Sequence, residues 1–176
     1  MFPPVGTPLD DTTRAKRSAS LVGHHYRVTD FYEVGRDKVC EFAKSLWDPH
    51  PAHWSEDDAR GLGYDGVIAP LTFGSIVAMV AQQRLFDEVV TGYDPSEMLH
   101  TDQRVQFHRP IAVGDRLYCD VFLDSFRRAA GSDFLVTKTI IRDQNDAPVQ
   151  TMWTTVVAYT PKLPGPVTQA ATTGLG

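Results

Sequence analysis

The sequence is poor in cysteine, in long apolar runs and in positive charge. It contains two cysteines, Cys40 and Cys119, and neither belongs to a Cys-x-x-Cys pair, which argues against a zinc site or a thiol-redox motif. We expect both to be small buried hydrophobic residues. No apolar run approaches the roughly 20 residues that a membrane-spanning helix needs, so we expect no membrane span. The net charge of -5 argues against nucleic acid as the main partner.

Both ends of the chain are rich in residues that disfavour a packed core. Residues 1–20 contain many Pro, Thr, Asp and Ser, and residues 161–176 contain many Pro, Gly, Thr and Ala. These compositions predict a disordered leader and a disordered tail on either side of one folded domain over 21–160. Residues 1–20 also lack the apolar segment of a secretory signal peptide, so we expect a cytoplasmic protein.

The first half of the expected domain shows helical periodicity. Val39, Phe42, Ala43 and Leu46 recur at helical spacing and predict a helix over 35–46, which the following prolines end. Ser55 begins a sequence that resembles a capping box, so a short helix should follow it. A longer helix is expected over 73–86, where small and apolar residues occupy nearly every position; such a helix is typically buried on all sides.

The second half shows strand periodicity. Apolar residues alternate through 117–123, and Thr, Val and aromatic residues dominate 149–159. The expected strands are 24–28, 103–108, 117–123, 134–141 and 149–159. The fold class predicted from this order is α+β, with a curved antiparallel sheet around one central helix.

One segment, Asp48-Pro49-His50-Pro51-Ala52-His53, brings a carboxylate and an imidazole close together on an extended linker. Such a pair can take a proton from one atom and deliver a proton to another. On spacing alone, a helix-end or turn role for Asp48 is favoured over a catalytic one, because Asp-Pro is a common turn pair. A metal site formed by Asp48, His50 and His53 is disfavoured because their spacing is not that of common zinc motifs. The flanking Trp47 and Trp54 are expected to pack in the core.

Several stretches resemble the MaoC-like group of hot-dog proteins, and in particular the actinobacterial proteins related to the mycolic-acid dehydratase subunits. The hydratase motif of that group reads Asp-x-Asn-Pro-x-His, and here Asp48, Pro51 and His53 match while His50 replaces Asn. Residues 22–27, 62–64, 69–73 and 114–118 carry the narrower likeness, which covers about 21–160.

The resemblance implies a single hot-dog domain and roles for particular residues. Asp48 and His53 would hold the water that adds across the double bond of the substrate. A backbone N–H at the start of the central helix would bind the thioester carbonyl oxygen. Catalytic members usually have a glycine there, but this chain has Pro70, which has no N–H to donate. Either Leu71 or Thr72 supplies the N–H from a neighbouring position, or the oxyanion hole is missing.

The resemblance also implies a function in fatty-acid-type metabolism, as a (3R)-hydroxyacyl-thioester dehydratase or trans-2-enoyl-thioester hydratase. The acyl group would be carried by CoA or acyl carrier protein, with no cofactor and no metal. Ser75 or Thr72 would hydrogen-bond the Asp–His pair, and a homodimer or a heterodimer with a related hot-dog subunit is expected.

Two alternative functions remain open. The sequence Ala-Pro-Leu-Thr-Phe at 69–73 is the form found in substrate-binding halves of two-subunit dehydratases, so a non-catalytic acyl-binding subunit is one. A thioesterase on the same fold is the other, although the hydratase-type motif argues against it.

Overall fold

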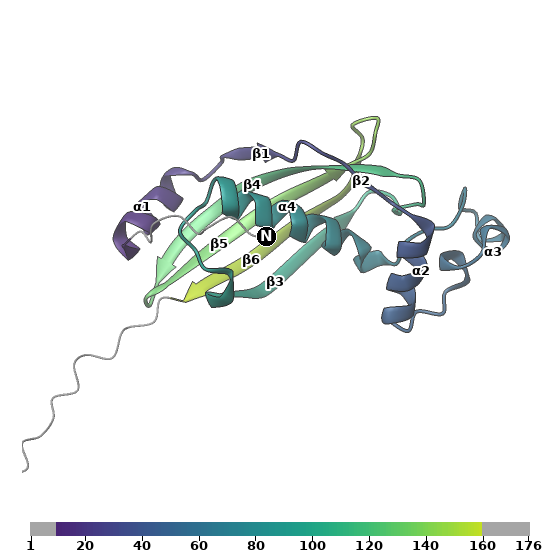
Figure 1. Ribbon diagram of the computed structural model, residues 1–176, viewed down its shortest axis with the longest axis horizontal. Helices are drawn as coiled ribbons and strands as arrows, with labels where there is room; N and C mark the ends of the chain where they lie inside the picture. The colour runs from purple at the N-terminus through teal and green to yellow at the C-terminus, as the bar shows by residue number, and fades with distance from the viewer. Residues whose placement is uncertain (1–9, 160–176) are drawn as a thin grey trace, which may run out of the picture.

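The computed structural model describes residues 10–159, which form a long antiparallel sheet with one helix lying along it (Figure 1). The strand order in the sheet is β1-β4-β5-β6-β3, and β2 pairs with β4 beside β1. The strands are β1 (His25–Arg27), β2 (Tyr32–Glu33), β3 (Met98–Phe107), β4 (Arg116–Ala129), β5 (Ser132–Arg142) and β6 (Pro148–Tyr159). The predicted fold class, an α+β protein with a curved antiparallel sheet around one central helix, is confirmed.

The central helix is α4 (Gly74–Glu88), and it follows the short 3₁₀ turn η2 (Leu71–Phe73). α1 (Asp11–Ser20) lies at one end of the sheet, while α2 (Arg36–Ser45) and α3 (Glu56–Gly61) lie together at the other end (Figure 1). Two more 3₁₀ turns are η1 (Pro51–His53) and η3 (Pro95–Glu97). The helices predicted from periodicity and from the Ser55 cap are present, and the Asp58 N–H donates to Ser55 Oγ at 3.2 Å.

The core lies between α4 and the inner face of the sheet. Alternate residues of β4, from Leu117 to Leu123, are buried, as their periodicity predicts. Val77, Ala81 and Leu85 cover them from α4. Cys119 belongs to this core, as expected, whereas Cys40 is only half-buried.

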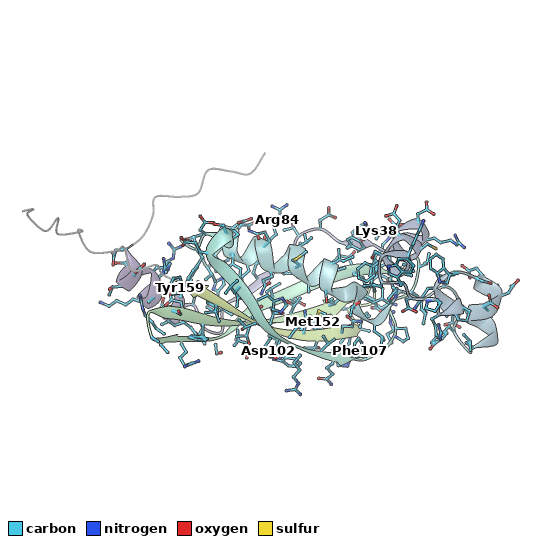
Figure 2. All side chains as sticks on the ribbon, turned by 90° about the horizontal axis from the view of Figure 1, so that it is seen from below. Lys38, Arg84, Asp102, Phe107, Met152 and Tyr159 are labelled. Carbon is cyan, nitrogen blue, oxygen red and sulfur yellow. The ribbon has the colours of Figure 1, made fainter. Side chains whose placement is uncertain are left out.

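The expectation that α4 is buried on all sides is wrong. Met79 and Val80 are 66% and 54% exposed, and Figure 2 shows Arg84 pointing away from the strands. The reason is that the sheet is open and covers only one side of the helix, so apolar residues on the other side remain uncovered. A groove of about 290 Å³ runs between α4 and the β3 side of the sheet. It is lined in part by Ser75, Met79, Phe86, Met98 and Val156.

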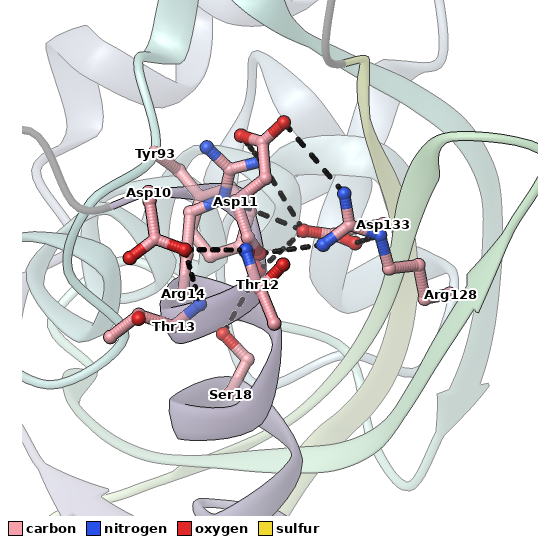
Figure 3. Close-up of polar contacts among 9 residues, drawn as sticks. All are labelled: Asp10, Asp11, Thr12, Thr13, Arg14, Ser18, Tyr93, Arg128 and Asp133. Carbon is pink, nitrogen blue, oxygen red and sulfur yellow. Dashed lines mark hydrogen bonds and ion pairs between the residues drawn. The ribbon is translucent and has the colours of Figure 1, made fainter.

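The prediction of a disordered leader does not hold for residues 11–20, which form α1. Asp10 caps this helix by accepting the N–H groups of Thr12 and Thr13. α1 is then held by an ion pair to β5, where Arg14 Nε lies 3.4 Å from the fully buried Asp133 carboxylate, and by a contact with the segment after α4, where Ser18 Oγ lies 2.9 Å from the Tyr93 hydroxyl (Figure 3). A buried carboxylate requires such partners. Residues 1–9 and the predicted tail over 161–176 lie outside the described residues.

A second charged cluster joins β1, β4 and β5. Asp120 accepts from Arg142 Nε at 3.0 Å and lies 2.8 Å from His25 Nε2. Burial favours a raised pKa for the Asp120 carboxyl, but the hydrogen bonds from His25 and Arg142 prevail and hold that pKa below its usual value. Within residues 10–159, no helix is long and apolar enough to cross a membrane.

Candidate active site

Asp48 is placed by the way in which α2 ends. The Asp48 N–H donates to the Ala43 carbonyl at 2.9 Å, and the Trp47 N–H donates to the Lys44 carbonyl at 3.1 Å. These two bonds form a Schellman motif, whose left-handed residue is usually glycine. Here that residue is Trp47, with φ of 56° and a side chain that is 92% exposed. The expectation that Trp47 packs in the core is therefore wrong, whereas Trp54 is half-buried.

The two oxygens of Asp48 have different surroundings. Oδ1 accepts the His50 N–H at 3.0 Å, which closes the turn that an Asp-Pro pair favours. Oδ2 lies 3.3 Å from Nε2 of His53. The turn and the acid–base pair therefore coexist, because each uses its own oxygen.

His53 is held in one orientation by a backbone carbonyl. Its Nδ1 lies 2.7 Å from the Ile68 carbonyl oxygen, and because a carbonyl only accepts, Nδ1 carries the hydrogen. In its neutral form the ring therefore presents Nε2, without a hydrogen, to the Asp48 carboxylate. The His53 side chain is 7% exposed and that of Asp48 is 34% exposed, so the pair is open to solvent on the Asp48 side.

Further bonds hold the loop between Asp48 and Trp54. The indole Nε1 of Trp54 donates to the Asp48 carbonyl at 3.2 Å, and the Ile68 N–H donates to the Ala52 carbonyl at 3.0 Å. Cys40 Sγ lies 3.5 Å from the His53 carbonyl oxygen. The loop is therefore fixed from α2, from its own indole and from the segment that leads to the central helix.

That segment ends at the start of the central helix. The Phe73 N–H donates to the Pro70 carbonyl, and Pro70 itself has no N–H. The N–H groups of Leu71 and Thr72, in the turn before α4, donate to no backbone carbonyl among the described residues, as expected for the first residues of a helical segment. Leu71 is exposed and Ser75 is half-buried in the groove beside α4.

The structure brings together some of the predicted residues and not others. Asp48 and His53 face each other, and Leu71 and Thr72 follow soon after Ile68, the residue that holds His53. Among the hydrogen bonds of residues 10–159, neither Ser75 nor Thr72 bonds to Asp48 or His53. Their assignment to the site stays a prediction.

Sequence reasoning missed Gln150 on β6. This side chain is 2% exposed, and its Oε1 has no hydrogen-bond partner among the described residues. It lies against Gly74, the first residue of α4, so closely that a Cβ at position 74 would overlap it. Only the glycine at the start of an otherwise good helix hinted at this contact.

Within the described part of the chain, no cluster of three or more His, Cys, Asp or Glu residues is placed to hold a metal ion. The ring of His50 lies 5.3 Å from that of His53, and its backbone N–H serves Asp48. A metal site made of Asp48, His50 and His53 is therefore not supported.

Comparison with known proteins gives the family. The family described as "FAS1-like, dehydratase domain region" matches residues 20–152. The chain belongs to this family. Its curated relatives include a Mycobacterium tuberculosis protein named "UPF0336 protein Rv0635", which is 40% identical over 139 residues, covering 79% of this chain and 88% of the relative.

Solved structures of similar sequence place this FAS1-like dehydratase domain among MaoC-like dehydratases with the hot-dog fold. A structure named "MaoC-like dehydratase" has a TM-score of 0.75 and 45% identity over 81% of this chain. Our chain spans 43% of that longer chain. The HadBC (3R-hydroxyacyl-ACP dehydratase) complex from Mycobacterium tuberculosis has a TM-score of 0.73 and 34% identity, covering 78% of this chain and 97% of the chain compared.

Proposed function

We propose that the protein is a hydro-lyase that adds water to trans-2-enoyl thioesters and removes water from (3R)-hydroxyacyl thioesters. The observation that carries this proposal is the 3.3 Å separation of Asp48 Oδ2 and His53 Nε2, which are two acceptors when His53 is neutral, with His53 bound to the segment that leads into the central helix. Two adjacent acceptors can bind one water molecule through both of its hydrogens. A lone pair of the water oxygen is then free to attack carbon.

In the hydration direction, the water oxygen forms a bond to C3 while one of its protons passes to the Asp48–His53 pair. The π electrons of the C2=C3 bond move toward the thioester carbonyl, and C2 then takes a proton. Dehydration is the reverse: C2 loses a proton, and the C3 hydroxyl leaves as water after it is protonated. The pair therefore needs one basic and one acidic member at different moments of the reaction.

Negative charge gathers on the thioester oxygen during this reaction. We assign its stabilisation to the N–H of Leu71 or Thr72, because the start of a helix combines free N–H groups with the positive end of the helix dipole. One such donor is worth on the order of 10²–10³ in rate. Pro70 removes one neighbouring donor, so the remaining N–H groups have to serve alone.

The groove beside α4 supports an acyl substrate. Its walls combine Ser75 near the start of the helix with apolar side chains further along, among them Met79, Phe86 and Met98. We propose that the acyl chain lies there, and that the carrier is CoA or acyl carrier protein in the cytoplasm. The HadBC complex, whose substrate is named as an acyl-ACP, supports the second carrier.

β3 supports association with a second hot-dog domain. It ends the strand order, and most of its side chains are exposed. A long open edge strand offers unpaired backbone groups to another strand. We propose a homodimer or a heterodimer with a related subunit, and the HadBC complex supports the heterodimer.

One observation favours a second function, that of a non-catalytic acyl-binding subunit. Pro70 stands where a donor is wanted at the helix start, so the oxyanion site is weaker than a glycine would make it. In that case a partner would supply the chemistry while this chain held the acyl group.

The test is hydration of short and long trans-2-enoyl-CoA substrates by the purified chain, measured as loss of enoyl absorbance. Asp48→Asn and His53→Ala should each lower the rate by about 10²–10⁴ while the protein stays folded. His24→Ala and Asp57→Asn change an exposed imidazole and an exposed carboxylate elsewhere, and should leave the rate unchanged. Inactivity of the parent chain with every substrate would contradict autonomous catalysis and favour the acyl-binding subunit.

A further inference from the structure

An ion-pair cluster of one half-buried arginine and two buried aspartates lies outside the acid–base pair. Arg109 donates to both oxygens of Asp115, from Nη1 at 2.8 Å and from Nη2 at 2.9 Å. Its Nη2 also donates to Asp143 Oδ2 at 3.1 Å. Both aspartates are buried, so these charge-assisted bonds are poorly screened by water. A bidentate guanidinium–carboxylate interaction fixes the relative orientation of the two groups as well as the distance between them.

The cluster sets the shape of the turn that leads into β4. Asp115 Oδ2 also accepts the Ala112 N–H at 2.8 Å, and the Arg109 Nη1 donates to the carbonyl of Pro110 at 2.8 Å. The side chains of Arg109 and Asp115, at the two ends of the turn over 109–115, therefore bond to each other and to the backbone between them. Asp143, which directly follows β5, ties the turn to the end of β5 at the same end of the sheet.

This turn pairs with the segment that precedes the central helix. The Val113 N–H donates to the Val67 carbonyl at 2.9 Å, and the Ala69 N–H donates to the Ile111 carbonyl at 2.8 Å. An isolated antiparallel bridge joins Ile68 to Ala112 between these bonds. The position of residues 67–69 is therefore set by the turn that Arg109 holds.

The opposite edge of the same segment holds the candidate active site. The Ile68 N–H donates to the Ala52 carbonyl at 3.0 Å, and the Ile68 carbonyl accepts from His53 Nδ1 at 2.7 Å. The chain then passes through Pro70 into the first turn of the central helix. One short segment thus connects the Arg109 cluster both to the histidine and to the helix start.

We propose that Arg109 is a positioning residue of the active site. It touches neither the Asp48–His53 pair nor the helix start, and it acts through the backbone of residues 67–69. This inference rests on the proposed hydro-lyase function, but its structural part concerns only the tautomer and placement of His53. A displacement of about 1 Å at a catalytic group can lower a rate by about 10².

The test compares Arg109→Met and Arg109→Lys with Arg128→Met in the full chain. Lysine keeps the charge but cannot form the bidentate interaction with Asp115. Arg109→Lys therefore tests whether the orientation of the turn matters, with less risk to folding than Arg109→Met. Arg128 is a matched control: its side chain is 32% exposed against 34% for Arg109, and it pairs with Asp133 at the α1 end of the sheet (Figure 3). The measurements are the ¹⁵N shifts of the His53 ring and the kcat and KM for a short trans-2-enoyl-CoA.

The parent and Arg128→Met should show a hydrogen on Nδ1 and an unprotonated Nε2. Both Arg109 variants should show mixed tautomers of His53 and a kcat lowered by about 10- to 100-fold, with KM little changed. Unchanged ring shifts in folded Arg109 variants would overturn the proposal. So would failure of both variants to fold while Arg128→Met folds, because the role would then be structural. If the parent is inactive but the ring shifts change as expected, the hydro-lyase function fails and the positioning of His53 stands.

Discussion

Replacement of Gly74 by alanine tests the packing at the start of the central helix. Gly74 has φ of -57° and ψ of -22°, a conformation open to any L-residue, so glycine is needed here for space and not for backbone freedom. A Cβ at this position would overlap Gln150 Oε1 and would approach Gln150 Cδ to 2.9 Å. Gln150 is buried, so its amide can move only by displacing other core atoms.

The expected change combines two opposing effects. Alanine is favoured over glycine in a helix by about 1 kcal/mol, whereas forcing an extra methyl group into a packed core costs about 1–3 kcal/mol. Gly74→Ala should therefore lower the free energy of unfolding by up to about 2 kcal/mol. When Gln150 is also changed to Ala, the overlap disappears, and Gly74→Ala should stabilise by up to about 1 kcal/mol.

The assay is urea unfolding of the parent, the two single variants and the double variant. The coupling energy between the two sites should be about 1–3 kcal/mol in favour of the double variant. Gly61→Ala is the control, because it lies in α3 and a Cβ there meets nothing within 4 Å. Equal effects of Gly74→Ala with and without Gln150 would refute the packing argument.

Three further predictions concern other parts of the fold. Trp47→Gly should raise the free energy of unfolding by up to about 1 kcal/mol and so raise the thermal midpoint, because the left-handed conformation costs tryptophan more than glycine. The exposed indole contributes little packing that could be lost. A lower midpoint would contradict this. In the native protein a thiol reagent should label Cys40 and spare Cys119, because burial and, to a smaller extent, the charge of Asp120 raise the pKa of the Cys119 thiol to about 12. Labelling of Cys40→Ser, in which only Cys119 remains, as fast as labelling of Cys119→Ser would contradict this. Because the pKa of Asp120 is lower in the folded state than in the unfolded chain, its contribution to stability is present above about pH 4 and is lost as the pH falls further. Asp120→Asn should therefore flatten the fall in unfolding free energy between about pH 4 and pH 2, and an unchanged slope would argue against this role.

The order of helices and strands was predictable because it depends on local patterns. The alternation from Leu117 to Leu123 has the period of a strand buried on one face, and the structure buries these residues. Ser55 begins α3 as a cap, and α2 ends just before the prolines at 49 and 51, which cannot continue a helix. Each of these signals lies within a few residues of the element that it controls.

The proximity of Asp48 and His53 in the candidate site was predictable for the same reason. Asp48 and His53 are only five positions apart, so their side chains are within reach of each other, although contacts with Ala43 and Ile68 fix their final orientation. The tautomer of His53 was not predictable, because it depends on the carbonyl of Ile68, which the turn at 109–115 holds in place.

The sequence by itself determined the elements, the α+β class and the neighbourhood of one carboxylate and one imidazole, because periodicity, capping and short spacing act within a few residues. Only the tertiary structure decided that Met79 is exposed, that α1 is fastened to Asp133 and that Gln150 lies beneath Gly74. These features depend on which strands pair and in which register. Register brings together residues far apart in the chain, and no local pattern records that pairing.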